Sequence, residues 1–145
     1  MKLIIQIPCY NEEKTLPVTL SSLPRKINGI DKIEYLIIDD GSKDGTINIA
    51  EKSGTHHIIK HSKNLGLAKA FITGINECLK LGADIIVNTD ADNQYYAEDI
   101  KKLVIPILEK KADIVIGTRP IEQIRIIKKK IFIFIYTLLV KNSAA

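Results

Sequence analysis

The fold prediction rests first on the stretch YLIIDDGSKDGT, residues 35–46. Its first four residues form a nearly continuous apolar run, which is typical of a strand covered on both faces in a parallel sheet. Two aspartates and a glycine follow, where that strand would end. Asp44 is a plausible N-cap for a helix that would stop at Gly54. The stretch therefore predicts a strand, a polar loop and a helix in succession.

Similar apolar runs recur along the chain, and amphipathic stretches separate them. Leucines repeat at helical spacing over residues 16–23, before Pro24, and further helices are expected near residues 67–79 and 100–108. Regular alternation of strands and helices implies right-handed crossovers and a doubly wound α/β fold with a mostly parallel sheet. The predicted strands lie in residues 3–7, 35–38, 57–59, 85–87 and 114–116.

The composition restricts the classes of partner and compartment. The 145 residues suffice for one domain, and the net charge of +4 permits an anionic partner such as a nucleotide or an acidic membrane surface. The dense basic cluster at residues 128–130 has no accompanying recognition motif, so nucleic-acid binding is not expected. Cys9 and Cys78 are expected to be reduced thiols, and the N-terminus lacks the features of a signal peptide. A cytoplasmic location is therefore expected.

Polar or acidic segments follow four of the five predicted strands. Because ligands of open α/β sheets bind outside the carboxyl ends of the strands, these segments should meet on one rim. The segments are residues 8–13, 39–46, 88–94 and 117–119.

The segment after the fourth predicted strand has the spacing of a cation site. Asp90 and Asp92, at i and i+2, can converge on one Mg²⁺ or Mn²⁺, with an amide oxygen from Gln94 nearby. Short acidic pairs are also common turn formers, and a capped turn before the helix near Ala97 explains the same residues. Both interpretations remain open at this point.

The other loops allow similar pairs of interpretation. Asp39 and Asp40 can accept hydrogen bonds from a base or ribose, or can form an Asx turn. The segment at residues 64–66 suits a phosphate at a helix start, with Lys60 and Lys63 adding positive charge, or is simply a helix start with a glycine for close packing.

Three further residue types can be given a provisional role. Arg119 can contact a phosphate with its planar guanidinium, or can be a solvated loop arginine. His56, His57 and His61 lack partners at zinc-ligand spacing and are interpreted as strand-edge residues. Cys9 has no general base placed by the sequence, so it is not expected to be a nucleophile.

Taken together and in order, the motifs resemble the family 2 glycosyltransferases of the GT-A fold. The resemblance extends to the dolichol-phosphate mannosyltransferase-like and polyprenyl-phosphate glycosyltransferase branch, and it covers about residues 2–121. The motifs that carry it are IPCYNEE at 7–13, DDGSKDGT at 39–46, NLG at 64–66 with Ala70, DADNQ at 90–94 and GTR at 117–119.

The resemblance implies a Rossmann-like GT-A three-layer sandwich with a mostly parallel sheet. It implies transfer of a sugar from a nucleotide-diphosphate donor, of UDP or GDP type, to an acceptor such as a polyprenyl phosphate. A divalent cation, Mg²⁺ or Mn²⁺, would be the cofactor. The implied donor-binding residues are Pro8, Tyr10, Glu12, Asp39, Asp40, Gly66 and Asp90, the implied metal ligands are Asp90, Asp92 and Gln94, and the implied catalytic residues are Asp92 and Arg119.

The resemblance divides the chain in two. Residues 1–121 would form the nucleotide-sugar-binding GT-A domain, and residues 122–145 a basic and apolar tail that matches nothing in the family. Since family members usually continue beyond this point, we expect a chain truncated after its donor-binding half. The alternative function is a non-catalytic or crippled nucleotide-sugar-binding module from a truncated gene.

Residues 128–140 combine three lysines with a run of ten residues, nine of which are apolar. The run is too short to span a bilayer as a helix, which takes about 20 residues. It can lie in the interface, which would place the protein at the inner face of the membrane, or it can pack on the sheet. Two other enzyme classes, sugar nucleotidyltransferases and dinucleotide dehydrogenases, usually have a glycine-rich loop after the first strand. Residues 8–11 contain no glycine, so neither class is favoured.

Overall fold

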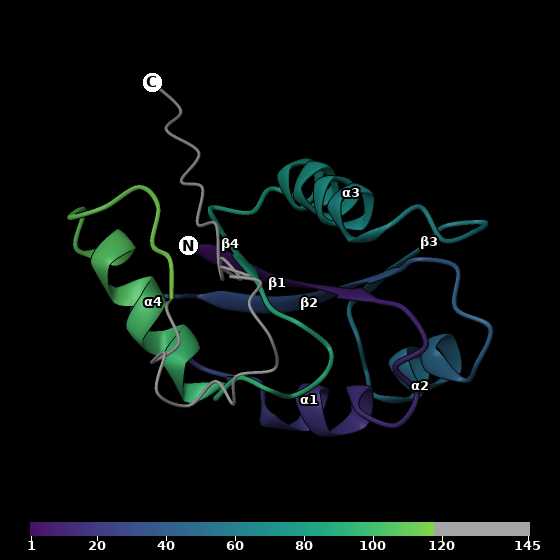
Figure 1. The fold of residues 1–145 in the computed structure, drawn as a ribbon. Coiled ribbons are helices and arrows are strands. Elements are labelled where there is room, and N and C mark those ends of the chain that lie inside the picture. The colour runs from purple at the N-terminus through teal and green to yellow at the C-terminus, as the bar shows by residue number, and fades with distance from the viewer. Residues whose placement is uncertain (118–145) are drawn as a thin grey trace, which may run out of the picture.

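The computed structural model describes residues 1–117 and shows a parallel sheet of four strands with helices on both faces (Figure 1). The strands are β1 (Lys2–Cys9), β2 (Lys32–Asp39), β3 (His57–Lys60) and β4 (Ile85–Asn88), in the spatial order β3-β2-β1-β4. The helices are α1 (Leu16–Ser22), α2 (Thr46–Lys52), α3 (Leu67–Lys80) and α4 (Glu98–Leu108).

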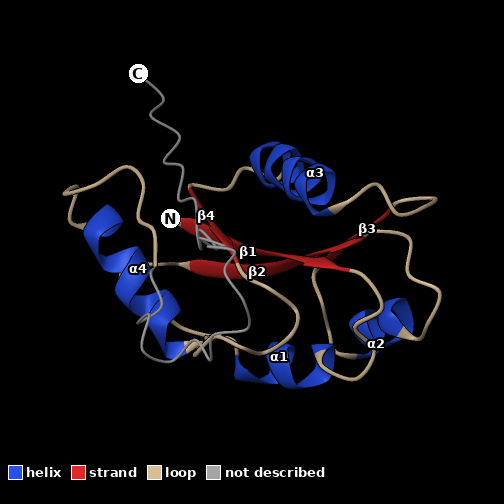
Figure 2. Cartoon of the chain, viewed as in Figure 1, coloured by secondary structure: helices blue, strands red, loops and turns tan. Residues whose placement is uncertain are grey.

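The elements form three layers, as the sequence predicted. Figure 2 shows α3 on one face of the sheet and α1, α2 and α4 on the other. The chain builds β1, β2 and β3 outward in one direction and then returns through α3 to place β4 on the other side of β1. The gap between the carboxyl ends of β1 and β4 is therefore the topological switch point, where open α/β sheets bind ligands.

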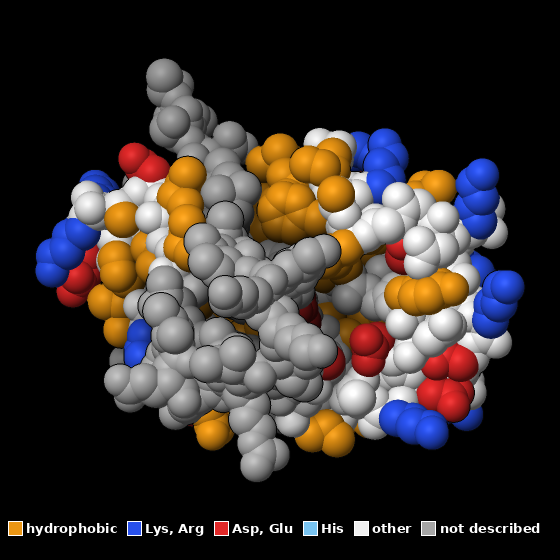
Figure 3. Space-filling view, viewed as in Figure 1, with side chains coloured by type: hydrophobic (Ala, Val, Ile, Leu, Met, Phe, Trp, Pro, Cys, Tyr) orange, Lys and Arg blue, Asp and Glu red, His pale blue; other side chains and the backbone are white. Residues whose placement is uncertain are grey.

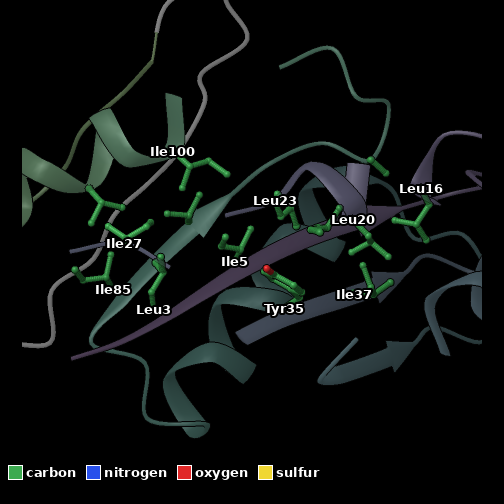
Figure 4. Close-up of a cluster of buried hydrophobic side chains, with 14 of the residues drawn as sticks. Leu3, Ile5, Leu16, Leu20, Leu23, Ile27, Tyr35, Ile37, Ile85 and Ile100 are labelled. Atoms are coloured by element: carbon green, nitrogen blue, oxygen red, sulfur yellow. The ribbon is translucent and has the colours of Figure 1, made fainter. Parts of the chain in front are cut away.

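Alternate residues of β1 serve the two faces. Leu3, Ile5 and Ile7 pack into the larger core with α1 and α4 (Figure 4), whereas Ile4 packs into the smaller core under α3. All four side chains are fully buried. Burying a side chain of this size contributes roughly 1.5–3 kcal/mol, so the central strand anchors both layers.

Helix α3 lies very close to the sheet because Gly74 faces it. A Cβ atom at Gly74 would lie only 2.1 Å from Oε1 of Gln6, a fully buried side chain of β1. The other end of the Gln6 amide donates to Oδ1 of Asn88 on β4, at 3.0 Å. A polar pair therefore connects β1 to β4 beneath the helix, two residues before the chain reaches Asp90.

The predicted start of α2 needs correction. The N-cap of α2 is Gly45 rather than Asp44. Asp44 lies one residue earlier, where its carboxylate accepts hydrogen bonds from the Thr46 amide at 3.1 Å and from the Thr46 hydroxyl at 2.5 Å. An aspartate that bonds two residues ahead forms an Asx turn, and sequence alone does not separate this turn from an N-cap.

The prediction of a fifth strand at residues 114–116 is wrong. Within the described residues this segment is not a strand, and Gly117 makes only an isolated bridge. Ile114 and Ile116 are 53% and 49% exposed. Isoleucine and valine favour a strand, but a strand exists only through hydrogen bonds to a neighbour, which composition cannot supply.

Candidate functional site

A pocket of about 390 Å³ opens at the carboxyl ends of β1, β2 and β4, at the switch point. The space-filling view shows a hollow beneath α3 with acidic side chains in and beside it, while lysines and arginines lie at the outer edges of this face (Figure 3). The lining residues come from four separate segments: Pro8, Cys9, Tyr10 and Glu12; Asp40; Asn64, Gly66, Leu67 and Ala70; and Asp90, Ala91 and Asp92.

The pocket brings together most of the site residues that the sequence suggested. The predicted residues that line it are Pro8, Tyr10, Glu12, Asp40, Gly66, Asp90 and Asp92. Asp39 and Gln94 are not among the lining residues. Arg119 lies outside the described residues, as do residues 128–140. Among the helices of residues 1–117, none has the length and apolarity that a membrane crossing requires.

The loop after β1 is held by the loop after β2. The Asn11 amide donates to the Ser42 hydroxyl at 2.9 Å, and the Glu12 amide donates to the Thr46 hydroxyl at 2.8 Å. The Glu12 carboxylate also accepts a hydrogen bond from the Thr15 hydroxyl. These contacts place Tyr10, which is 43% exposed, at the mouth of the pocket.

Asp40 is a pocket carboxylate that accepts three hydrogen bonds. Its Oδ1 accepts from the His61 ring at 2.7 Å and from the Leu65 amide at 2.9 Å, and its Oδ2 accepts from the Gly66 amide at 2.8 Å. Burial acts to raise the pKa of Asp40, but these hydrogen bonds outweigh it and hold the pKa below its usual value. Asp40 is therefore an anion that organises the start of α3.

This arrangement changes the phosphate hypothesis for residues 64–66. The Leu65 and Gly66 amides, which could have met a phosphate, donate to Asp40 instead. Gly66 also donates to the Asn64 side chain at 3.1 Å. The segment therefore contributes a shaped wall to the pocket, and these two amides are already occupied within the chain.

Asp39 faces the other side of the sheet and is fully buried. Its Oδ2 accepts from the Ser42 amide at 3.2 Å, and its Oδ1 is buried without a hydrogen-bond partner. Side chains alternate along a strand, and at the end of β2 this alternation places Asp40, rather than Asp39, against the pocket. The motif alone did not decide which of the two it would be.

The loop after β4 places Asp90 and Asp92 together in the pocket, on either side of the buried Ala91. Oδ1 of Asp92 accepts from the Gln94 amide at 3.0 Å, so the turn that the sequence offered as an alternative is present as well. The Gln94 side chain is exposed. Within residues 1–117, no three His, Cys, Asp or Glu side chains form a cluster that could hold a metal on their own.

The cysteine and the histidines have structural contacts. Burial, reinforced by nearby carboxylates, raises the pKa of the Cys9 thiol, so this pocket-lining side chain is a poor nucleophile, as expected. His57 contacts Glu34 at 2.8 Å, and His56 accepts the Tyr35 amide at 3.1 Å. His61, interpreted from the sequence as a strand-edge residue, instead contacts Asp40. The parallel register, which aligns Asp39 with Lys60, is the signal that could have found this contact.

Comparison with known proteins identifies the family of the chain. A family model described as Glycosyl transferase family 2 matches residues 4–135, and the chain belongs to this family. The UDP-N-acetylglucosamine–dolichyl-phosphate N-acetylglucosaminyltransferase of Methanococcus voltae is 37% identical over 129 residues, which cover 78% of this chain and 50% of that protein. The undecaprenyl-phosphate mannosyltransferase of Micrococcus luteus is 32% identical over 123 residues, with 82% and 49% covered.

A solved structure supports the GT-A fold. The glucosyl-3-phosphoglycerate synthase of Mycobacterium tuberculosis, crystallised with Mn²⁺, UDP and glucosyl-3-phosphoglycerate, superposes with a TM-score of 0.59 at 24% identity. The match covers 74% of this chain and 39% of that one. The chain spans about half the length of the curated relatives that it matches.

Proposed function

We propose that the pocket binds a nucleotide-diphosphate sugar, of UDP or GDP type, together with a divalent cation, and that the protein transfers the sugar to an acceptor. The observation that carries this proposal is the meeting of Asp40, Asp90 and Asp92, from the ends of two strands, in one pocket with Glu12. Concave pockets with a few convergent polar groups at a switch point are the usual ligand sites of α/β sheets.

The carboxylates suit a cation that is shared with the ligand. Mg²⁺ and Mn²⁺ prefer oxygen donors, and Mg²⁺ is commonly held by one or two carboxylates plus substrate phosphates rather than by a complete protein cage. Asp90 and Asp92 supply that number of side chains, and they would hold the cation. When bound, the cation would offset the charge of the diphosphate as the nucleotide leaves.

The remaining roles follow from the position of each residue. Pro8, Tyr10 and Glu12 would border the nucleoside, beside the wall that Asp40 organises. Arg119, which follows the described residues, would contact the phosphate or the acceptor. The relatives named for dolichyl and undecaprenyl phosphates favour a polyprenyl phosphate as the acceptor class. Such an acceptor already carries an oxyanion and needs little help from a general base.

Calorimetric titration tests the binding half of the proposal. UDP and GDP, and their sugar derivatives, would be titrated into the full chain in Mn²⁺ and in EDTA. We expect one family of nucleotides to bind at one site, with the affinity dependent on Mn²⁺. The absence of binding for both families would refute the proposal.

A transfer assay then separates a transferase from a donor-binding module. Radiolabelled sugar from the donor that binds would be offered to a short polyprenyl phosphate in detergent, and the lipid product would be extracted and counted. Labelled lipid supports the transferase. Donor binding without transfer of the labelled sugar to either the lipid or water would instead identify a nucleotide-sugar-binding module.

A further inference from the structure

His61 lies directly beyond β3, next to the pocket but behind its lining. Its side chain is 9% exposed, and that of its partner Asp40 is 5% exposed. Nδ1 contacts Oδ1 of Asp40 at 2.7 Å, and Nε2 contacts the Thr73 hydroxyl at 3.1 Å. One ring thus joins the loop after β2 to the second turn of α3.

The two hydrogen bonds define the tautomer of the His61 ring. The anionic carboxylate of Asp40 can only accept, so the Nδ1 atom of His61 carries a proton and donates. In the neutral ring, Nε2 then accepts from the Thr73 hydroxyl. Thr73 therefore fixes the ring from the side opposite to Asp40, and the ring has a defined orientation.

Asp40 can accept hydrogen bonds from the two amides of the loop after β3 only if its carboxylate is correctly oriented. Both of its oxygens must be aimed correctly to receive the Leu65 and Gly66 amides, at 2.9 and 2.8 Å. The terminal torsion of an aspartate is broad, so the backbone of β2 does not fix that aim. The His61 ring is the side chain that holds the carboxylate at Oδ1.

The loop that Asp40 holds has little room to move. A Cβ atom on Gly41 would lie 2.5 Å from the backbone carbonyl carbon of Lys63, so the loops after β2 and β3 touch through their backbones. Gly66, which ends the second loop, lines the pocket beside Asn64. A small rotation of Asp40 would therefore be transmitted to this wall.

We propose that His61 is a positioning residue for the donor nucleotide: through Asp40 it fixes the wall at residues 64–66 against which the nucleotide binds. The inference rests on the proposed function, since it assumes that the pocket binds a nucleotide. His61 does not touch the ligand and takes no part in the transfer. Its effect is to keep the wall in the binding geometry before the ligand arrives, which removes an ordering cost from binding.

Three variants of the full chain test the role. His61→Ala removes the ring, whereas His61→Asn places an amide nitrogen close to the position of Nδ1. His57→Ala is the matched control, because it also removes a histidine from a carboxylate, Glu34, but at the opposite end of β3. The affinity for UDP or GDP, whichever the wild type prefers, would be measured by calorimetry in Mn²⁺.

We expect His61→Ala to weaken nucleotide binding about tenfold, the equivalent of one lost hydrogen bond to a charged group. His61→Asn should restore the affinity to within about threefold of the wild type, because the donor to Asp40 is replaced. His57→Ala should bind the nucleotide like the wild type. Equal affinity of His61→Ala and the wild type, or no recovery in His61→Asn, would overturn the proposal.

Amide exchange in the ligand-free protein gives a second readout that does not require a nucleotide. In His61→Ala, the Leu65 and Gly66 amides should exchange faster by about tenfold, while amides of β1 should keep their wild-type rates. Unchanged exchange at Leu65 and Gly66 would refute the role of His61 even if the affinity fell. If the wild type binds no nucleotide but this exchange effect is present, the proposed function fails and the hold of His61 on the wall stands.

Discussion

The two ends of the sheet differ in whether their carboxylates form ion pairs. At the amino ends of the strands, Glu34 is buried and pairs with Lys2 at 2.8 Å, Lys32 at 2.6 Å and His57 at 2.8 Å. At the carboxyl ends, Glu12 and Asp92 face the pocket, and neither forms an ion pair within residues 1–117. At the amino ends, basic side chains of the chain itself neutralise the charge of Glu34. At the carboxyl ends, negative charge is concentrated around the pocket.

The difference separates stability from function. A carboxylate with three cationic or proton-donating partners stabilises the folded chain, and nothing outside the chain is needed to compensate it. Glu12 and Asp92 face the pocket without a cationic partner in residues 1–117, so their charges repel one another, and a bound cation would relieve that repulsion. Mutations at the two ends should therefore have different consequences, one in the free energy of unfolding and the other in ligand binding.

Asp92→Asn should have the largest effect. We expect the Mn²⁺-dependent affinity for the nucleotide to fall by about 100-fold, because a neutral amide is a much weaker ligand for a hard cation. The melting temperature should stay the same or rise slightly, since one repelling charge is removed. Calorimetry and thermal unfolding measure the two quantities, and a lower melting temperature with unchanged affinity would assign Asp92 to the fold instead.

Glu34→Gln should show the reverse pattern. The variant leaves Lys2 and Lys32 without their anion, so we expect the free energy of unfolding to fall by about 2 kcal/mol. Nucleotide affinity should remain at the wild-type value, since Glu34 lies at the far end of the strands from the pocket. Urea unfolding measures the loss, and a change in nucleotide affinity in the folded variant would show that the two ends are coupled.

Acid unfolding gives a smaller, pH-dependent version of the same comparison. Burial raises the pKa of Glu34, but hydrogen bonds from Lys2, Lys32 and His57 prevail and lower it to about 2, against 4.5 for an ordinary glutamate. The depressed pKa contributes stability that is present above pH 4.5 and is lost as the pH falls toward 2. The stability difference between the wild type and Glu34→Gln should therefore shrink across this window in urea titrations. A constant difference would contradict the assignment.

Lys32→Met should have the smallest effect of the series. Lys32 is 63% exposed, whereas Lys2 is 23% exposed and also donates to the Leu81 carbonyl at 2.9 Å. Solvent screens the Lys32 pair, so we expect a loss of only about 0.5 kcal/mol, and a larger loss for Lys2→Met. Urea unfolding of the two variants side by side tests this order, and equal losses would show that exposure does not separate the two lysines.

The sequence predicted the helices and strands whose formation is marked by a local pattern within one segment. The apolar runs of β1, β2 and β4 identified these strands because burial on both faces leaves a local pattern, and the leucine spacing identified α1 because one helix face is buried. Residues 114–116 carry the same composition but lack strand pairing in the described chain. Whether a strand forms there depends on a partner strand, and a single segment holds no information about its partner.

The site shows the same division. The loops at 8–13, 39–46 and 90–94 could be placed on one rim, because parallel strands share their direction. The choice between Asp39 and Asp40 required the phase of β2, and the contact of His61 required the register of β3 with β2. The pairing of Asp40 with the Leu65 and Gly66 amides depends on two loops at once, the one after β2 and the one after β3, and no motif describes it.

In the function proposed above, Asp90 and Asp92, in the loop after β4, share one cation with a nucleotide diphosphate in the pocket. The most direct test is a titration of Mn²⁺ into the wild type and Asp92→Asn, with and without UDP or GDP, followed by the electron paramagnetic resonance signal of the unbound ion. We expect the nucleotide to tighten Mn²⁺ binding by the same factor by which Mn²⁺ tightens nucleotide binding, and we expect this coupling to be lost in the variant. A nucleotide that binds the wild type equally well in EDTA and in Mn²⁺ would contradict the proposed function.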